Sequence, residues 1–170
     1  QLFPDGSATA RSVDARTEVK GIVTGIDSAA RAFPVLGQRV RTDTLTVFAG
    51  GTFDTLVNQY VEVSGFRGVP GDLLATRIEI SSTVVPGAPL EVTGTVGAFD
   101  PVAKTFVVGA QVVDFSQVGA AFLPPALANG VVVDVHGTMV GTGGPLVASD
   151  ISIVSTVVPG SENSKVEVEG

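Results

Sequence analysis

Residues 82–87 read STVVPG, and residues 155–160 read STVVPG again, 73 positions further along the chain. The same displacement carries many other residues onto identical ones, so the chain contains a tandem repeat. A fold argument made for one copy should therefore apply to the other. Identical pairs at this displacement include Glu18 and Glu91, Val19 and Val92, Gly21 and Gly94, Phe33 and Phe106, and Ile78 and Ile151.

Both ends of the chain continue the repeat. Residues 167–170 read EVEG, which resembles the start of the first copy, EVKG at 18–21, and of the second copy, EVTG at 91–94. Near the N-terminus, the segment around Arg11 resembles the close of the first copy around Arg77. Either a longer array is cut out of phase, or subunits of this length complete one another in trans.

This pattern predicts four segments. Each end segment holds one strand, which either belongs to a neighbouring unit of an array or pairs in trans with another molecule. The segments are a closing strand within 1–16, a β-barrel repeat at 17–87, a second β-barrel repeat at 88–160, and an opening strand within 161–170.

Charged side chains are scarce. They make up 16% of the residues and the mean hydropathy is +0.43, whereas about 25% charged residues is usual for a soluble domain. Two small barrels standing alone would expose too much apolar surface at this composition, so we expect part of it to face the other copy or another subunit. No apolar run approaches the roughly 18 residues of a membrane span, because Pro124 and Pro125 interrupt the stretch 118–128. The sequence therefore predicts no membrane span.

The net charge is −7 and the isoelectric point is near 4.5. Phosphate binding needs clustered Lys and Arg, so nucleic acid is not an expected partner. Cysteine is absent, which excludes disulfides and thiolate metal sites. The chain begins with Gln and shows no signal segment, as in a processed secreted chain or a fragment. We expect a secreted, extracellular or cell-surface protein, with the periplasm as the alternative.

Apolar and polar residues alternate in short segments, as in β-strands with one buried face. The alternation is clearest at 61–64 and at 78–80. One stretch, 52–58, is typical of a single helical turn with Thr52 as N-cap, and a Pro-rich connection replaces it in the second copy. We therefore predict an all-β fold of two tandem small OB-like β-barrels with an extra β-strand at each chain end. Strands are expected at 18–26, 32–36, 40–42, 46–48, 60–66 and 73–80, and at the corresponding places of the second copy.

The connection between the copies is expected to be a linker centred on 86–89. Proline restricts its own backbone and that of the residue before it, so the segment should follow an extended path. On this interpretation the two barrels superpose and no continuous sheet runs across them.

The motifs in these strands also resemble a known family. Each copy opens with the pattern EVxGxV, followed by a turn at Asp27 or Asp100. The segments VEVSG at 61–65 and VDVHG at 133–137 stand in the middle of the copies, and ATRIE at 75–79 closes the first. In this order they resemble the bacterial domain-of-unknown-function family 5666. The resemblance implies exported, often tandem, OB-like β-barrels, and it brings no catalytic residues.

Candidate chemical groups are few. His136 is the only histidine and occupies the place that Ser64 has in the first copy; we expect a polar residue on the outer face of a strand rather than a catalytic base. Asp27 and Asp100 stand where a hairpin favours a turn-forming Asp. Motifs of nucleotide-binding, calcium-binding and common hydrolytic sites are missing. The sequence predicts a protein that is not an enzyme and has no catalytic residue, cofactor or metal; a metal held by His136 with Asp134 or another carboxylate would overturn this.

The apolar loop at 118–128 has no counterpart of that character in the first copy. It either packs locally over the mouth of its barrel or is buried against a neighbouring molecule, and we expect the second. Unpaired strand edges at the chain ends should also find partners. The expected assembly interface comprises Thr9, Arg11, Val13, Phe122, Leu123, Leu127, Val166 and Val168.

Two functions remain. The first is a non-catalytic exported structural protein, a subunit or segment of an extracellular filament or surface array that self-associates through β-strand addition and apolar contacts. The second is an OB-type binding module for an oligosaccharide or peptide at the bacterial surface or in the periplasm. Carbohydrate-binding faces usually offer Trp or Tyr, and the chain has no Trp and one Tyr, Tyr60. The sequence therefore favours the structural protein and does not identify a small-molecule or glycan ligand.

Overall fold

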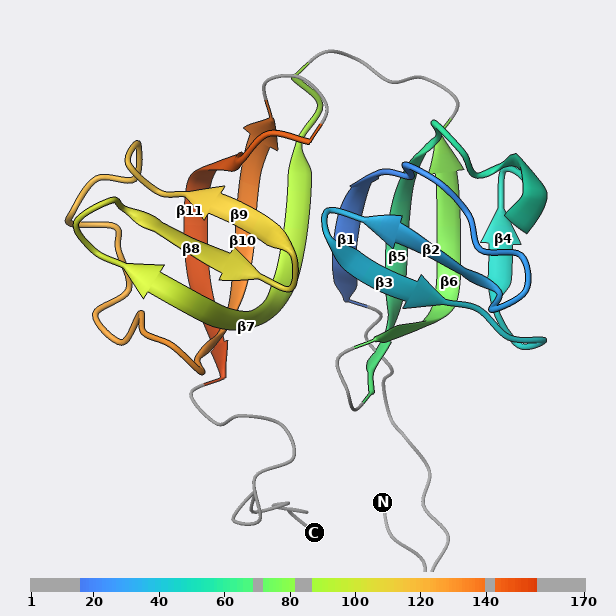
Figure 1. The fold of residues 1–170 in the computed structure, drawn as a ribbon, viewed down its shortest axis with the longest axis horizontal. Helices are drawn as coiled ribbons and strands as arrows, with labels where there is room; N and C mark the ends of the chain where they lie inside the picture. Colours follow the sequence, from blue (N-terminus) through green and yellow to red (C-terminus); the bar gives the residue numbers. More distant parts are fainter. Residues whose placement is uncertain (1–15, 69–71, 82–86, 140–142, 156–170) are drawn as a thin grey trace, which may run out of the picture.

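The computed structural model describes residues 16–68, 72–81, 87–139 and 143–155. These residues form eleven β-strands and one short turn of 3-10 helix, η1 (Phe53–Thr55) (Figure 1). The predicted all-β fold is confirmed. The expected end strands, at 7–13 within the first segment and at 165–170 within the last, lie outside the described residues, as does the first half of the linker at 82–86.

The strands follow the same order in both copies. Those of the first copy are β1 (Thr17–Ile22), β2 (Ala32–Val35), β3 (Gln38–Arg41), β4 (Val47–Ala49), β5 (Tyr60–Arg67) and β6 (Leu73–Ser81). Those of the second copy are β7 (Leu90–Asp100), β8 (Thr105–Val108), β9 (Gln111–Asp114), β10 (Val132–Met139) and β11 (Leu146–Ser155). The strand β4 and the turn η1 occur in the first copy, and an irregular segment between β9 and β10 takes their place in the second.

Strand pairing closes the second copy into a five-stranded barrel. β7 pairs with both β8 and β10, β8 pairs with β9, and β11 joins β10 antiparallel to β9 parallel. The first copy has the same order of pairings, including a parallel pair of β3 and β6. There the contact between the first two strands consists of an isolated bridge between Val23 and Val35. Each copy therefore contains a parallel pair, β3–β6 or β9–β11, among antiparallel ones.

A glycine lets the long strands bend at the same place in both copies. The pairing register shifts between Ser64 and Gly65 in β5 and between His136 and Gly137 in β10. A Cβ atom on either glycine would lie 2.2 Å from a backbone oxygen of the neighbouring strand. No side chain fits at that distance, so the close approach of the strands requires glycine.

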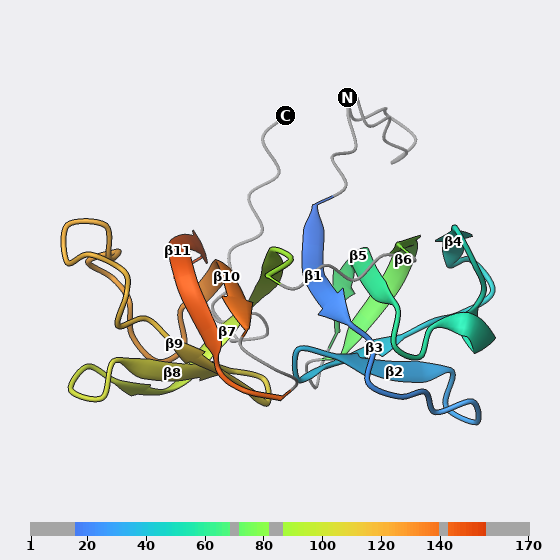
Figure 2. The ribbon, with the colours of Figure 1, turned by 90° about the horizontal axis from the view of Figure 1, so that it is seen from above.

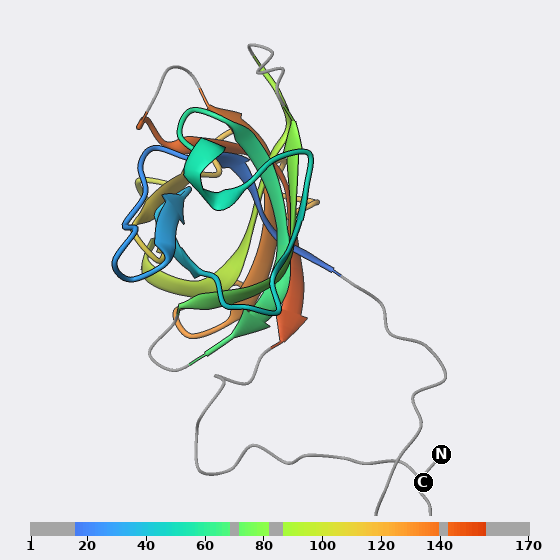
Figure 3. The ribbon, with the colours of Figure 1, turned by 90° about the vertical axis from the view of Figure 1, so that its right-hand side faces the viewer.

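Large apolar side chains fill the interior, and aromatic residues lie at equivalent places. Phe33 and its repeat equivalent Phe106 are each 1% exposed. Phe33 meets Phe53 of η1 edge-on, with ring centroids 6.3 Å apart. Phe106 instead meets Phe115, at 5.8 Å. A residue of the β9–β10 segment thus packs in the second core as Phe53 of the helical turn packs in the first. Figure 3 shows η1 at one end of the first copy.

The two copies are joined by strand pairing as well as by the chain. β1 and β7 lie side by side and antiparallel, and Val19 pairs with Val92 and Lys20 with Glu91 (Figure 1). One eleven-stranded sheet therefore runs through both copies. The prediction that no sheet would cross between them is wrong. β5 occupies one edge of β1 and β10 occupies one edge of β7, and the remaining edges of β1 and β7 pair with each other.

Candidate functional site

A row of ionisable side chains crosses the sheet, one on each of six neighbouring strands. Each of these residues lies directly opposite the next one on the neighbouring strand. Because side chains opposed in this way share a face of the sheet, the row forms one band. In order from β6 to β11, its members are Glu79, Glu62, Lys20, Glu91, His136 and Asp150. We call these residues the polar row.

On the first copy's side, the polar row is held by hydrogen bonds and an ion pair. Lys20 Nζ lies 3.0 Å from Glu62 Oε2, and Thr17 Oγ1 donates a 2.7 Å hydrogen bond to Glu62 Oε1. These two contacts, first the Thr17 hydroxyl and then Lys20, lower the pKa of Glu62. The hydrogen bond to Glu62 in turn raises the pKa of Lys20. This part of the row is electrostatically balanced.

On the second copy's side, Glu91, Asp134 and His136 form a compact group. His136 Nε2 lies 3.3 Å from Asp134 Oδ2, and His136 Nδ1 lies 3.9 Å from Glu91 Oε2. Both carboxylate side chains are 16% exposed and the imidazole is 46% exposed. Burial, with a smaller effect from the charge of Asp134, raises the pKa of Glu91. Two mostly buried acids thus share one half-exposed imidazole.

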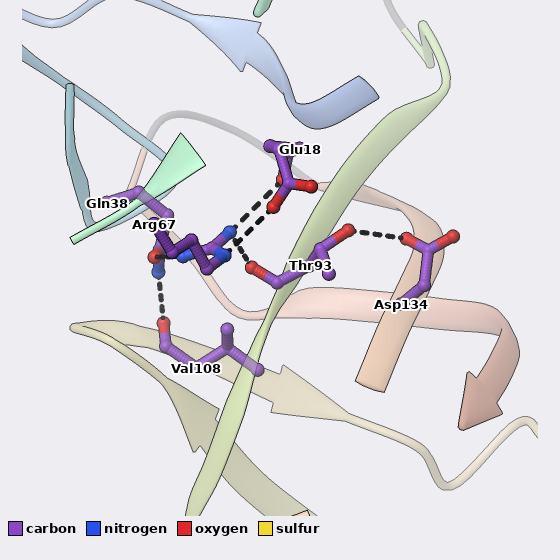
Figure 4. Close-up of polar contacts among 6 residues, drawn as sticks. All are labelled: Glu18, Gln38, Arg67, Thr93, Val108 and Asp134. Carbon is purple, nitrogen blue, oxygen red and sulfur yellow. Dashed lines mark hydrogen bonds and ion pairs between the residues drawn. The ribbon is translucent and has the colours of Figure 1, made fainter. Parts of the chain in front are cut away.

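The junction between the copies holds a second polar group, centred on Arg67 (Figure 4). Arg67 Nε donates to Glu18 Oε2 at 2.9 Å, and its Nη1 donates to Gln38 Oε1 at 3.0 Å. Its Nη2 donates to the backbone oxygen of Thr93 in the second copy. Gln38 Nε2 reaches the backbone oxygen of Val108 at 2.8 Å. Burial lowers the pKa of Arg67, and its donors tie the copies together.

A shallow hollow of about 220 Å³ lies beside the β2–β3 hairpin. It shares no residue with the polar row, and Asp27 in its lining already accepts a hydrogen bond from the backbone nitrogen of Ala30 at 3.0 Å. The lining residues are Asp27, Ala32, Phe33, Pro34, Gly37, Gln38 and Arg39.

The structure separates the residues expected in the assembly interface. Phe122 is 76% exposed, Leu123 is partly buried and Leu127 is 8% exposed and belongs to the core of its own copy. The loop thus packs locally through Leu127 and leaves Phe122 exposed; its burial against a neighbouring molecule stays a prediction. The remaining interface residues, Thr9, Arg11, Val13, Val166 and Val168, lie outside the described residues.

The turn and strand predictions for single residues hold. Asp100 Oδ1 accepts hydrogen bonds from the backbone nitrogens of Val102 and Ala103, at 2.8 and 2.9 Å, and Asp27 has the similar role described above. His136 lies on the outer face of β10, as expected. Sequence reasoning missed Glu91 as its neighbour, because only the register of β7 against β10 brings them together.

Residues 20–79 match the family described as "Domain of unknown function (DUF5666)". This segment spans most of the first copy, and the match confirms there the resemblance drawn from the sequence. No curated protein and no solved structure matches the chain. In the described residues, no helix has the length and apolar character needed to cross a membrane.

Proposed function

We propose that the chain is a non-catalytic, exported structural protein that self-associates through β-strand addition and apolar contacts, as a subunit or segment of a filament or surface array. The observation that carries the proposal is the β1–β7 pairing. The first strands of two copies are joined edge to edge there, with Val19 opposite Val92. Residues 167–170 repeat the sequence motif of these strands, and the β1–β7 pairing is a precedent for adding such a strand to a sheet edge of another molecule.

A strand edge in the first copy supports the proposal. Among the described residues, β4 pairs with β6 alone, so no second strand lies on its other side. Its side chain Val47 is 54% exposed, and Leu45 just before it is 82% exposed. An exposed edge with apolar flanks is a site at which another strand can add.

The position of the apolar loop gives a second line of support. Figure 2 shows the segment between β9 and β10, drawn in orange, at the outer end of the second copy, and β4 at the outer end of the first. Phe122 in that segment and Val47 in β4 are both largely exposed. Two different apolar surfaces at opposite ends permit a heterologous, head-to-tail contact, which repeats without closing and gives a filament.

The binding-module alternative has less support. Tyr60 is 8% exposed and its hydroxyl donates to the backbone oxygen of Pro89. It therefore offers no exposed ring on which a sugar would stack, and the chain has no Trp.

The test compares the intact chain with a chain that lacks residues 165–170. Light scattering after size exclusion and negative-stain microscopy should show large particles for the intact chain and soluble monomers for the truncated one. A control replaces the same six positions with a Gly/Ser segment, and circular dichroism checks that both variants remain folded. If the truncated chain assembles like the intact one, or the intact chain is monomeric, the proposal is wrong and the binding module takes its place.

A further inference from the structure

The group formed by Glu91, Asp134 and His136 has the geometry of a ligand set. Each residue offers one ligand atom, and these atoms lie within 4.8 Å of one another. Two antiparallel strands fix their places, since Glu91 of β7 is the direct partner of His136 of β10. Metal ligands at bond lengths of about 2.0–2.2 Å stand roughly 3–3.5 Å apart around one ion. The 3.3 Å between His136 Nε2 and Asp134 Oδ2 already has this value. The Glu91 carboxylate lies 3.9 Å from Nδ1 on the other side of the ring, so a shared ion requires this carboxylate to turn toward Nε2.

The corresponding acids in the first copy have basic side chains as partners, which the second copy lacks. In the first copy, Lys20 lies 3.0 Å from Glu62, and Arg67 lies 2.9 Å from Glu18. The acids are therefore neutralised by bases of the chain itself. In the repeat alignment, Glu18 corresponds to Glu91 at the displacement of 73 residues. Glu62 corresponds to Asp134 at a displacement of 72, as VEVSG at 61–65 aligns with VDVHG at 133–137.

The second copy keeps both acids and lacks both bases. Lys20 is replaced by Thr93, and Arg67 by Met139. At the same time Ser64 is replaced by His136. The exchange removes two fixed positive charges and adds an imidazole, which is a common metal ligand. We propose that Glu91, Asp134 and His136 bind a divalent transition-metal ion, for which Zn²⁺ is the best-matched choice.

The surroundings of the group fit this role. Thr93 Oγ1 donates to Asp134 Oδ1 at 3.2 Å (Figure 4), which orients the carboxylate and leaves Oδ2 toward His136. Hydrogen bonds of this kind to ligating carboxylates are usual in metal sites. Lys20 faces Glu91 from β1, but its ammonium group is bonded to Glu62. The half-exposed imidazole leaves the group open to solvent, so an ion can enter and keep water ligands.

The donor atoms select the class of ion. One imidazole nitrogen and two carboxylate oxygens suit Zn²⁺, whereas Ca²⁺ and Mg²⁺ are bound by oxygen alone. Among divalent first-row ions, Cu²⁺ and Ni²⁺ also bind nitrogen and oxygen ligands strongly. The ion would link β7 to β10 beside the junction of the two copies.

Isothermal titration of the full chain with ZnCl₂ tests the proposal, with Co²⁺ absorption in the visible range as a second probe. The intact chain should bind one Zn²⁺ saturably. Glu91→Gln, Asp134→Asn and His136→Ser should each weaken binding by about tenfold or more. The last variant introduces the residue that the first copy has at this place. Asp100→Asn is the matched control: it removes one charge from the second copy and keeps the acceptor oxygen of its turn, so binding should not change.

Circular dichroism and thermal unfolding without metal establish that the variants are folded. The proposal is overturned if the intact chain shows no saturable binding up to millimolar Zn²⁺. It is also overturned if His136→Ser binds Zn²⁺ as tightly as the intact chain, or if Asp100→Asn loses as much affinity as the three ligand variants. Assembly is measured separately, so a failure here does not affect the test of self-association.

Discussion

Val19 and Val92 occupy the same position in the two copies, and they face each other across the β1–β7 pairing. A second contact between the copies has the same property. Ala110, the repeat equivalent of Gly37, donates its backbone N–H to the oxygen of Gly37 at 3.2 Å. Contacts between equivalent positions define an isologous interface, the kind found in two-fold symmetric dimers. The chain therefore holds within itself the type of junction that joins two identical subunits.

Because Gly37 lies so close to the second copy, adding one methyl group there should destabilise the fold. Gly37 has φ +66°, and a Cβ there would lie 2.4 Å from the backbone nitrogen of Gln111 in the second copy. Gly37→Ala should lower the free energy of unfolding by about 1 kcal/mol for the backbone conformation and by a further 1–3 kcal/mol, roughly, for the overlap. Urea unfolding measures the sum.

Gly143→Ala provides the matched control for that variant. Gly143 also has a positive φ, +83°, but a Cβ there meets nothing within 4 Å. It should therefore show the backbone cost alone. Equal losses in the two variants would contradict the close contact between the copies.

Replacing Arg67, a single side chain at the junction, should strongly lower the free energy of unfolding. Arg67→Met introduces the residue that the second copy has at the equivalent place, and it leaves Glu18, whose side chain is 16% exposed, without its ion pair. Breaking such a pair should lower the free energy of unfolding by about 2–4 kcal/mol. Arg77→Met removes an exposed arginine paired with Glu79 and should cost less than about 1 kcal/mol. Similar losses for both arginines would show that the junction contributes little to stability.

In the apolar loop at 118–128, one substitution should affect the stability of the fold and another should affect assembly. Leu127→Ala removes a core side chain that is 8% exposed and should lower the free energy of unfolding by about 2–4 kcal/mol. Phe122→Ser changes a side chain that is 76% exposed and should alter stability by less than about 0.5 kcal/mol. Light scattering should show smaller particles for Phe122→Ser. A strongly destabilised Phe122→Ser would mean that this ring packs within its own molecule.

Two glutamates of the polar row predict opposite effects of pH. The pKa of Glu62 is lowered in the folded state by Thr17 and Lys20, so its ionised form stabilises the fold at neutral pH and this contribution is lost as the pH falls through the glutamate range. The pKa of Glu91 is raised by burial and by Asp134, so its contribution is present at low pH and is lost as the pH rises.

Isosteric variants separate these two contributions. At pH 7 and in the presence of a chelator, Glu62→Gln should lower the free energy of unfolding and Glu91→Gln should raise it. Both differences should shrink in the acid range as the two glutamates of the intact chain become protonated, that of Glu91 at a higher pH than that of Glu62. Thermal unfolding across this range measures the trend, and a shift of the same sign for both variants at pH 7 would contradict it.

The amino-acid sequence determined the repeated β architecture and much of its local detail. Displacement by 73 residues revealed the copies, and alternation in segments such as 61–64 identified which residues face inward. Asp27 and Asp100 form their turns with backbone groups two or three residues away, so the sequence alone specifies them. Interactions of this range depend on neighbours along the chain.

Only the tertiary structure decided which strand edges meet. The pairing of β1 with β7 is made by backbone N–H and C=O groups, which every residue type carries except for the missing N–H of proline, so no side-chain pattern marks it. The register of β7 against β10 brings Glu91 to His136 across 45 positions of sequence, and the packing of the two copies places Arg67 against Thr93 of the other copy. Alternation in a strand specifies the face on which a side chain lies, whereas its neighbours on that face depend on how the strands pair in three dimensions.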